Sequence, residues 1–371
     1  MSGRLSVSAE ALRLNFEHIR KQSGKTVAPV VKADAYGLGV RNIAPVLWDV
    51  GARTFFVATL VEGLRLRSLL PQAEILVLDG PALEQPGAAA NSLDKFLEAE
   101  LIPVLNSREQ ARVWPADLTC ALHVDTGMKR LGLDVEAAVE ISAGLGSVAI
   151  LLTHYARADE PGHPSLAGQS RVFSGCVDAI RQLHPELRVS ASNSAAALTA
   201  SGNPAGNIEE DIVRTGIALY GGNPFDARPN PMLPVCRLTG RVLQRVQVQA
   251  GEAVGYGGSY VAPESRVLAT VGVGYADGVP RLLSNQGRVA IVAGEEILFA
   301  PIVGRVSMDL IHIDVTELES DVDVGTEVEF LGQHVGVDEV AAQAQTISYE
   351  VLTGLNAADR LETEMLETLL P

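Results

Sequence analysis

The sequence predicts an α/β protein in which a (β/α)8 barrel of the TIM type precedes a mostly β domain. The chain has 371 residues, more than one hydrophobic core usually serves. Its first part alternates short apolar runs with stretches of helical apolar spacing, whereas its second part has only short alternating runs separated by glycines. We therefore expect a barrel over residues 1–228 and a mainly β domain over 229–371.

Eight apolar runs in the first part predict the strands of the barrel. None alternates cleanly, which is typical of strands buried on both faces. Eight β/α units within roughly 220 residues match the size of such a barrel. A doubly wound sheet is the alternative, but it requires a glycine-rich turn after its first strand, and residues 31–34 form no such turn. The expected strands are 27–31, 54–59, 74–78, 101–105, 119–124, 148–153, 188–192 and 211–220.

The texture of the sequence changes after residue 222. A proline-rich stretch at 223–234 predicts a linker. Beyond it we expect a helix at 337–344 and an amphipathic terminal helix at 360–370. The strands expected in this part are 238–248, 265–273, 289–292, 297–302, 311–315 and 327–330.

Composition narrows the class of partner. A net charge of −16 argues against nucleic acid or an anionic membrane, and no apolar run approaches the ~20 residues that span a bilayer. The first ten residues lack the pattern of a signal peptide, so we expect a cytoplasmic protein. Cys120, Cys176 and Cys236 are widely spaced and have no metal-ligand pattern, so we expect neither a metal site nor a disulfide.

Lys32 stands out among the five lysines because it ends an apolar, β-branched run. Burial disfavours the charged form of a lysine, which lowers its pKa and makes the amine nucleophilic towards carbonyls. One interpretation is a Schiff-base lysine on a barrel strand. The other is an edge-strand lysine whose amine reaches water.

Other polar residues follow the expected strands, where the functional residues of a barrel lie. Each has a simpler explanation: His154 could be a buried structural histidine, and Asn193 or Ser194 could cap a helix. Their gathering at one rim with Lys32 favours a site. Ser194 and the backbone amides at 216 and 217 could hold a phosphate, and Arg214 could face a heteroaromatic ring, which together suit pyridoxal phosphate.

At this point the sequence resembles a known family. The segment VVKADAYG at 30–37 is similar to the cofactor-lysine motif of bacterial alanine racemases, which are fold-type III pyridoxal-phosphate enzymes. The resemblance is collinear over nearly all of the chain. The further matching segments are VDTGMKRLG (124–132), THYARADE (153–160), SNSAA (192–196), VRTGIALYG (213–221), VGYG (254–257), GYADGVPR (274–281), GRVSMD (304–309) and ISYE (347–350).

The resemblance implies a role for each matched residue. Lys32 would bind the cofactor covalently and act as one catalytic base, while Tyr256 from the other subunit of a homodimer would be the second base on the opposite face. Arg130 would contact the cofactor's ring hydroxyl and the substrate carboxylate. The other implied cofactor-binding residues are Tyr36, His154, Asn193, Ser194, Arg214, Gly216, Ile217 and Tyr349. The other implied substrate-binding residues are Tyr275, Met308 and Asp309.

The sequence departs from the family pattern at three positions near the implied site. Many family members carry a carbamylated lysine where this chain has His123. Lys129 and Thr215 replace a frequent glycine and a frequent proline. The resemblance implies racemisation of alanine, supplying D-alanine for peptidoglycan or serving alanine catabolism.

Three alternatives to an alanine racemase stay open at this stage. The first is a serine or broad-specificity amino-acid racemase. The second is a non-catalytic pyridoxal-phosphate-binding protein, which the long second domain disfavours. The third is a decarboxylase of the same fold type, which Arg214 and the lack of cysteine after Cys236 disfavour.

Overall fold

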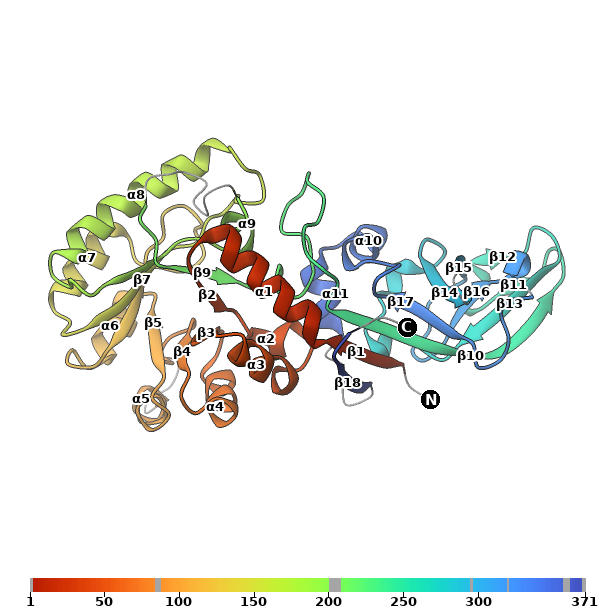
Figure 1. Cartoon of the computed structure of the whole chain (residues 1–371), viewed down its shortest axis with the longest axis horizontal. Helices are drawn as coiled ribbons and strands as arrows, with labels where there is room; N and C mark the ends of the chain where they lie inside the picture. Colours follow the sequence, from red (N-terminus) through yellow and green to blue (C-terminus); the bar gives the residue numbers. More distant parts are fainter. Residues whose placement is uncertain are drawn as a thin grey trace.

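The computed structural model describes residues 3–83, 88–199, 208–293, 296–318, 320–355 and 361–368. It has two lobes, a barrel surrounded by helices and an elongated β domain that extends from it (Figure 1). Within the described residues, no helix combines the length and the apolar character needed to cross a membrane.

Eight parallel strands form the barrel, and all lie at their expected places. β3 to β8 pair in chain order, and β2 pairs with β9. A bridge between Val30 and Phe56 joins β2 to β3, and the backbone N–H of Arg214 donates to Ser192 O over 2.9 Å to join β9 to β8. The strands are β2 (Thr26–Pro29), β3 (Thr54–Val57), β4 (Glu74–Val77), β5 (Ile102–Leu105), β6 (Cys120–His123), β7 (Val148–Leu152), β8 (Arg188–Ser190) and β9 (Ile212–Thr215).

The strands are buried as their sequence predicts. Every residue of β3, β6 and β9 is buried, so these strands face the barrel core on one side and the helices on the other. The helices of this domain are α1 (Ala9–Ser23), α2 (Lys32–Tyr36), α3 (Val40–Asp49), α4 (Leu60–Leu69), α5 (Ala88–Glu98), α6 (Arg108–Val113), α7 (Val135–Ala143), α8 (Pro164–Arg181) and α9 (Ser194–Ala197).

Six antiparallel strands of the second domain close on themselves, in the order β10–β13–β16–β15–β14–β17 and back to β10. They are β10 (Cys236–Val248), β13 (Arg266–Val271), β14 (Arg288–Ala293), β15 (Glu296–Val303), β16 (Ile311–Asp314) and β17 (Glu327–Leu331). The expected strands of this part are confirmed. A short hairpin of β11 (Ala253–Val254) and β12 (Tyr260–Val261) is separate, and the helices are α10 (Val337–Gln343), as expected, and α11 (Ser348–Gly354).

The prediction of a terminal helix at 360–370 is wrong. Residues 362–366 form a strand, β18 (Glu362–Leu366), which runs parallel to β1 (Arg4–Ser8), while residues 360, 369 and 370 lie outside the described residues. β1 in turn pairs antiparallel with β10, so residues 4–8 and 362–366 both lie in the sheet of the second domain (Figure 1). The partner that makes 362–366 a strand lies at the other end of the sequence, and local periodicity carries no trace of it.

The second domain also covers one side of the barrel rim. α11 packs against the turn after β2 so closely that a Cβ on Gly37 would lie 2.3 Å from Leu352 O. The rings of Tyr36 and Tyr349 lie 6.1 Å apart between their centroids. The wall of any site at this rim therefore comes from both domains.

Candidate active site

A cavity of about 670 Å³ opens at the carboxyl ends of the barrel strands. Its wall is formed by residues that follow the strands of the barrel and, on one side, by α11. Its volume is within the range of small-molecule and cofactor sites. Lys32, Arg130, His154, Asn193, Ser194, Arg214, Gly216, Ile217, Tyr36 and Tyr349 all line it, so the structure brings together the expected residues of the first domain and Tyr349 of the second.

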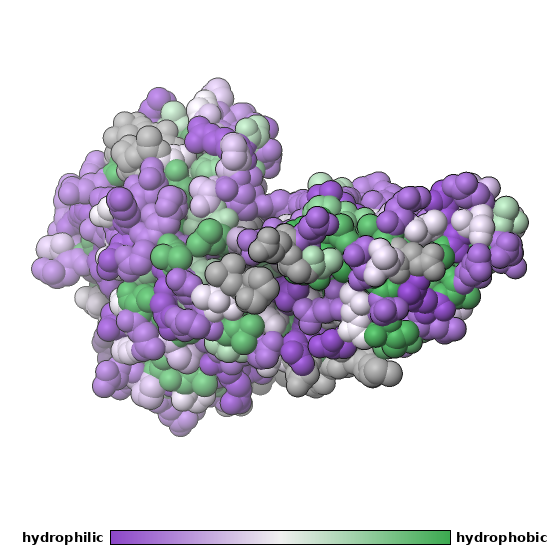
Figure 2. All heavy atoms as spheres, turned by 45° about the vertical axis from the view of Figure 1, so that its right-hand side comes forward, coloured by the Kyte–Doolittle hydropathy of each residue, from purple (hydrophilic) through white to green (hydrophobic). Residues whose placement is uncertain are grey.

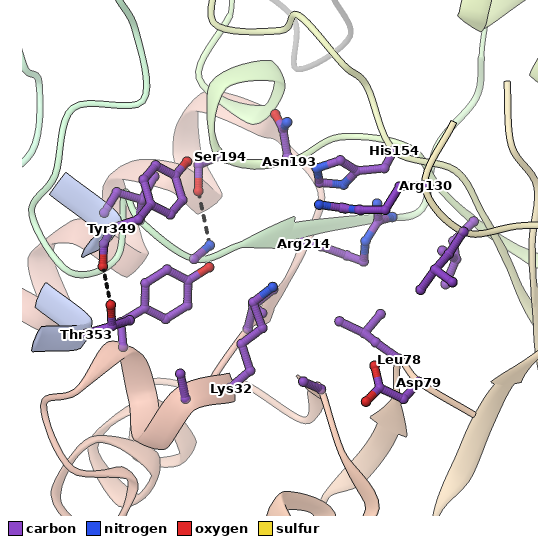
Figure 3. Close-up of a pocket in the computed structure, with 18 of the residues that line it drawn as sticks. Lys32, Leu78, Asp79, Arg130, His154, Asn193, Ser194, Arg214, Tyr349 and Thr353 are labelled. Carbon is purple, nitrogen blue, oxygen red and sulfur yellow. Dashed lines mark hydrogen bonds between the residues drawn. The ribbon is translucent and has the colours of Figure 1, made fainter. Parts of the chain in front are cut away.

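Lys32 follows β2 and extends its amine into this cavity, between Ser194 and Tyr349 on one side and Arg130 and His154 on the other (Figure 3). Burial, and then the positive charge of Arg130, lower the pKa of Lys32 below its ordinary value. Glu62 and Asp79 act in the opposite direction. At any given pH, a larger fraction of Lys32 is therefore neutral than of a surface lysine. A nucleophile or a proton acceptor has to be neutral in this way.

The backbone after Lys32 takes a rare conformation. Residues 33–36 have φ of 52°, 54°, 55° and 56°, so they form one turn of left-handed helix without any glycine. This conformation costs roughly 1–2 kcal/mol for each L-residue. Such strain persists only where the surroundings impose it, and it is common at functional sites. Here the turn places the side chain of Tyr36 directly against Gly216 in the cavity wall.

Ser194, Gly216 and Tyr36 form a compact polar cradle. Ser194 Oγ accepts hydrogen bonds from the backbone N–H of Gly216 over 3.0 Å and of Ala218 over 3.4 Å. A Cβ at position 216 would lie 2.1 Å from the Tyr36 hydroxyl, so only glycine fits there. Hydroxyls and backbone amides gathered in this way can hold a phosphate without lysine or arginine.

Arg214 is buried at the end of β9, with 6% of its surface exposed. It donates to Ser190 O over 2.9 Å and to Ser190 Oγ over 2.6 Å, and its other terminal nitrogen donates to Thr153 O. Burial lowers the pKa of Arg214 to about 10, so the guanidinium keeps its charge at neutral pH. The backbone carbonyls of Ser190 in β8 and of Thr153, directly after β7, thus fix a cation in the cavity wall.

The two histidines of the cavity are neutral at physiological pH. Burial, together with the charges of Arg214 and Arg130, lowers the pKa of His154 to about 3 and that of His123 to about 4. Asn106 donates through Nδ2 to the carbonyls of Leu78 and Val104, so its Oδ1 accepts from His123 Nδ1 over 2.8 Å. His123 therefore carries its proton on Nδ1, and its Nε2 is left as an acceptor.

Four expected residues lie outside the cavity of this chain. Tyr256, Tyr275 and Met308 are 71%, 41% and 51% exposed, and Asp309 is exposed beside them in sequence. Backbone hydrogen bonds of 3.0 Å, from Tyr275 to Ser307 and from Ala276 to Met308, hold Tyr275 next to Met308. Within the described residues, none of the four lines the cavity that contains Lys32.

Asp79, Asn106 and Glu62 are among the polar residues of this region to which the sequence analysis gave no role. Asp79 and Asn106 line the cavity and follow the strands β4 and β5, so the rule that identified His154 could have found them. Glu62 contacts the backbone of Ala33 from α4. Thr59 and Glu62 have the spacing of a helix capping box, but that pattern says nothing of a contact with Ala33.

Comparisons with known proteins agree on one family. Residues 7–224 match the family model "Alanine racemase, N-terminal domain" and residues 235–363 match "Alanine racemase, C-terminal domain". An alanine racemase of Methylobacterium sp. (strain 4-46) is 40% identical over 365 residues, covering 95% of each chain. A catabolic alanine racemase of Agrobacterium fabrum is 42% identical over 370 residues, covering 95% of this chain and 90% of the relative.

A solved structure has the same fold. The alanine racemase from Bartonella henselae, with covalently bound pyridoxal phosphate, aligns with a TM-score of 0.87 at 31% identity. The alignment covers 99% of this chain and 100% of the other.

Proposed function

Because the chain belongs to the alanine racemase family, we propose that it interconverts L-alanine and D-alanine with pyridoxal 5′-phosphate as cofactor. The observation that carries the proposal is a lysine of lowered pKa that enters a cavity opposite a cradle of hydroxyl and amide groups. The product D-alanine would serve peptidoglycan synthesis, or the reaction would serve alanine catabolism, the role for which the Agrobacterium relative is named.

The cavity fits this cofactor. Because Gly216 has no Cβ, the Tyr36 hydroxyl lies directly against its backbone, beside Ser194. The residues of this part of the cavity wall that would hold the phosphate are Tyr36, Ser194, Gly216, Ile217 and Tyr349. Lys32 would form the covalent link. Arg214, with Asn193 and His154 beside it in the wall, would face the ring nitrogen, and because an arginine does not release its proton the ring nitrogen would stay unprotonated.

The cofactor, when bound, supplies an electron sink that makes the α-proton of an amino acid removable. Lys32 Nζ would take that proton, or return it, on one face of the α-carbon. Burial and Arg130 lower the pKa of Lys32, which favours the neutral amine needed to accept a proton. Arg130, at the cavity wall, would bind the substrate carboxylate.

Inversion needs a second proton-transferring group on the opposite face of the α-carbon. Tyr256 is the proposed group, and its 71% exposure supports a position in the cavity of a second copy of the chain. Tyr275, Met308 and Asp309 would enter with it and narrow the access to the substrate. Figure 2 shows hydrophobic residues on the surface of the second-domain arm. Val261 and Leu282 of this domain are 54% and 57% exposed, and exposed apolar side chains of this kind support the formation of a homodimer.

A coupled assay tests the function. Conversion of L-alanine to D-alanine by the purified protein is compared with conversion of L-serine, L-lysine and L-arginine. We expect alanine to be preferred. A preference for serine would support the first alternative, and full cofactor binding without conversion of any of the four would support a non-catalytic pyridoxal-phosphate-binding protein.

A further inference from the structure

The left-handed turn that follows Lys32 has an external anchor. Within the turn, Ala35 N–H donates to Val31 O over 2.9 Å and Gly37 N–H to Ala33 O over 2.8 Å. These bonds leave the first amide of the turn, that of Ala33, without a partner in the turn. It donates instead to Glu62 Oε1 over 2.8 Å, from a helix that begins 27 residues later.

Glu62, the third residue of α4, also binds the backbone between β3 and α4. Its Oε2 accepts from the backbone N–H of Ala58 over 2.8 Å and of Thr59 over 3.1 Å, while Thr59 Oγ1 accepts from Glu62 N–H over 3.3 Å. A capping box needs only the bonds with Thr59. Oε1 is therefore free to serve a second purpose, and it joins the end of β3 to the strained turn after β2.

The position of Glu62 matters for two cofactor-facing residues at once. Lys32 precedes the anchored amide directly, and Tyr36 ends the same turn against Gly216. Non-glycine residues do not hold a left-handed turn unless the surroundings impose it. Asp34 also holds the turn, because its carbonyl accepts from the backbone N–H of Gly39 over 3.0 Å and its Oδ1 from that of Val40 over 2.9 Å. Loss of the bond to Glu62 would free the first amide of the turn, next to Lys32, and so displace the amine and, through the rest of the turn, the hydroxyl.

We propose that Glu62 is a positioning residue, whose carboxylate holds the left-handed turn and thereby aims Lys32 and Tyr36 at the cofactor. The inference rests on the proposed function, because it takes pyridoxal phosphate as the ligand. The carboxylate lies within electrostatic reach of Lys32, so its charge and its hydrogen bond have to be separated by experiment.

The test is the dissociation constant of pyridoxal phosphate, measured by titrating full-length apoprotein and following cofactor absorbance, in Glu62→Gln and matched variants. The amide of glutamine can accept on one side only, so it cannot serve Ala33 and the Ala58–Thr59 pair together. We expect binding to weaken by about tenfold or more, as for loss of a hydrogen bond to a charged group.

Two controls separate the possible causes. Thr59→Ala weakens the helix cap but leaves the bond from Ala33 to Glu62, so binding should stay within about twofold while thermal stability falls. Asp79→Asn removes the other carboxylate that acts on Lys32, without removing an anchor of the turn. If Thr59→Ala weakened cofactor binding as much as Glu62→Gln does, Glu62 would act only as a helix cap. If Asp79→Asn weakened it as much, Glu62 would act only through its charge. Either result overturns the proposal.

A rescue variant keeps the test independent of folding. Glycine adopts positive φ at no steric cost, so Ala33→Gly should restore most of the binding that Glu62→Gln loses. Failure of the double variant to recover binding would overturn the proposal even if the single variant folds poorly. If the wild-type protein binds no pyridoxal phosphate, the proposed function fails and the inference fails with it. If the wild type binds and Glu62→Gln binds equally well, only the inference fails.

Discussion

The barrel rim contributes buried residues to the proposed site, whereas the loops of the second domain contribute exposed ones. At the rim, Arg214 is 6% exposed, its two terminal nitrogens donate to backbone carbonyls, and Lys32 enters a formed cavity. In the second domain, Tyr256 and Met308 are 71% and 51% exposed, and within the described part of the chain neither lines the cavity that contains Lys32. The groups at the rim lose their water when the chain folds, whereas those in the loops of the second domain stay hydrated.

This difference separates two kinds of work. Binding a cofactor requires groups that are already desolvated and oriented, because ordering them at the moment of binding weakens affinity. A residue that completes the site from another copy must stay exposed until the copies associate, and it then loses water from both surfaces together. The barrel rim should therefore bind cofactor in a single chain, whereas catalysis should require two. The predictions below test this division, beginning with the largest expected effect.

Replacement of Lys32 tests the rim most severely. Lys32→Ala removes both the covalent link and one proposed base, so we expect activity to fall by at least about 10⁴-fold. In the wild type, borohydride reduction should attach a pyridoxyl group to a peptide that contains Lys32, found by mass spectrometry. The label on any other peptide would remove the site assignment. Circular dichroism of the variant serves as the folding control.

Mixing of two inactive proteins tests the division between the regions. We expect Tyr256→Phe to lose about 10²–10⁴-fold in activity while still binding cofactor, because the lost group transfers a proton and does not hold the ligand. After subunit exchange with Lys32→Ala, half of the dimers should be mixed and each should have one intact site, which gives roughly a quarter of wild-type activity. Absence of recovery after proven exchange would mean that both bases act within one chain.

The sequence predicted the residues of the rim better than the contacts that hold them in place. The order of strands and the position of Lys32 follow from buried apolar runs, which are local signals, and the position of Tyr349 in the cavity agrees with its motif. The left-handed turn was not predictable, because Ala33 and Ala35 have no preference for positive φ and the turn depends on Glu62. The strand β18 was missed for a similar reason, since it exists only through its pairing with β1.

His123 provides a test of how completely the rim is desolvated. Its pKa is lowered from 6.5 to about 4 by burial and by Arg214 and Arg130. Between pH 6.5 and pH 4, His123 is protonated in the unfolded chain but not in the folded chain. The titration of His123 therefore leaves the free energy of unfolding unchanged above pH 6.5 and lowers it as the pH falls from 6.5 to 4. The shift corresponds to about 3 kcal/mol.

The measurement compares His123→Gln with wild type in the apoprotein by denaturant unfolding at several pH values. The wild type should lose about 3 kcal/mol more than the variant between pH 6.5 and pH 4, while above pH 6.5 the difference between them should be constant. A difference that does not change with pH would mean that His123 titrates normally, and that this side of the rim is more hydrated than the structure indicates.

The smallest expected effect concerns bicarbonate. Family members with a carbamylated lysine present an anion near the residue that corresponds to Arg130, whereas here a neutral His123 presents only Nε2, with its proton held at Nδ1 by Asn106. A lone-pair acceptor can take a hydrogen bond from a guanidinium but repels an anion, so we expect activity to change by less than about twofold on removal of bicarbonate, or on exchange of chloride for an inert anion at constant ionic strength.

His123→Lys is the matched control: Arg130 and Arg214 would lower the pKa of the new amine, which favours carbamylation, so this variant should gain a dependence on bicarbonate. Loss of wild-type activity without chloride would indicate an anion bound beside Arg130, against the neutral-acceptor interpretation. A bicarbonate requirement in the wild type would point to a native lysine, the nearest in sequence being Lys129, which is ion-paired with Asp125 over 3.2 Å.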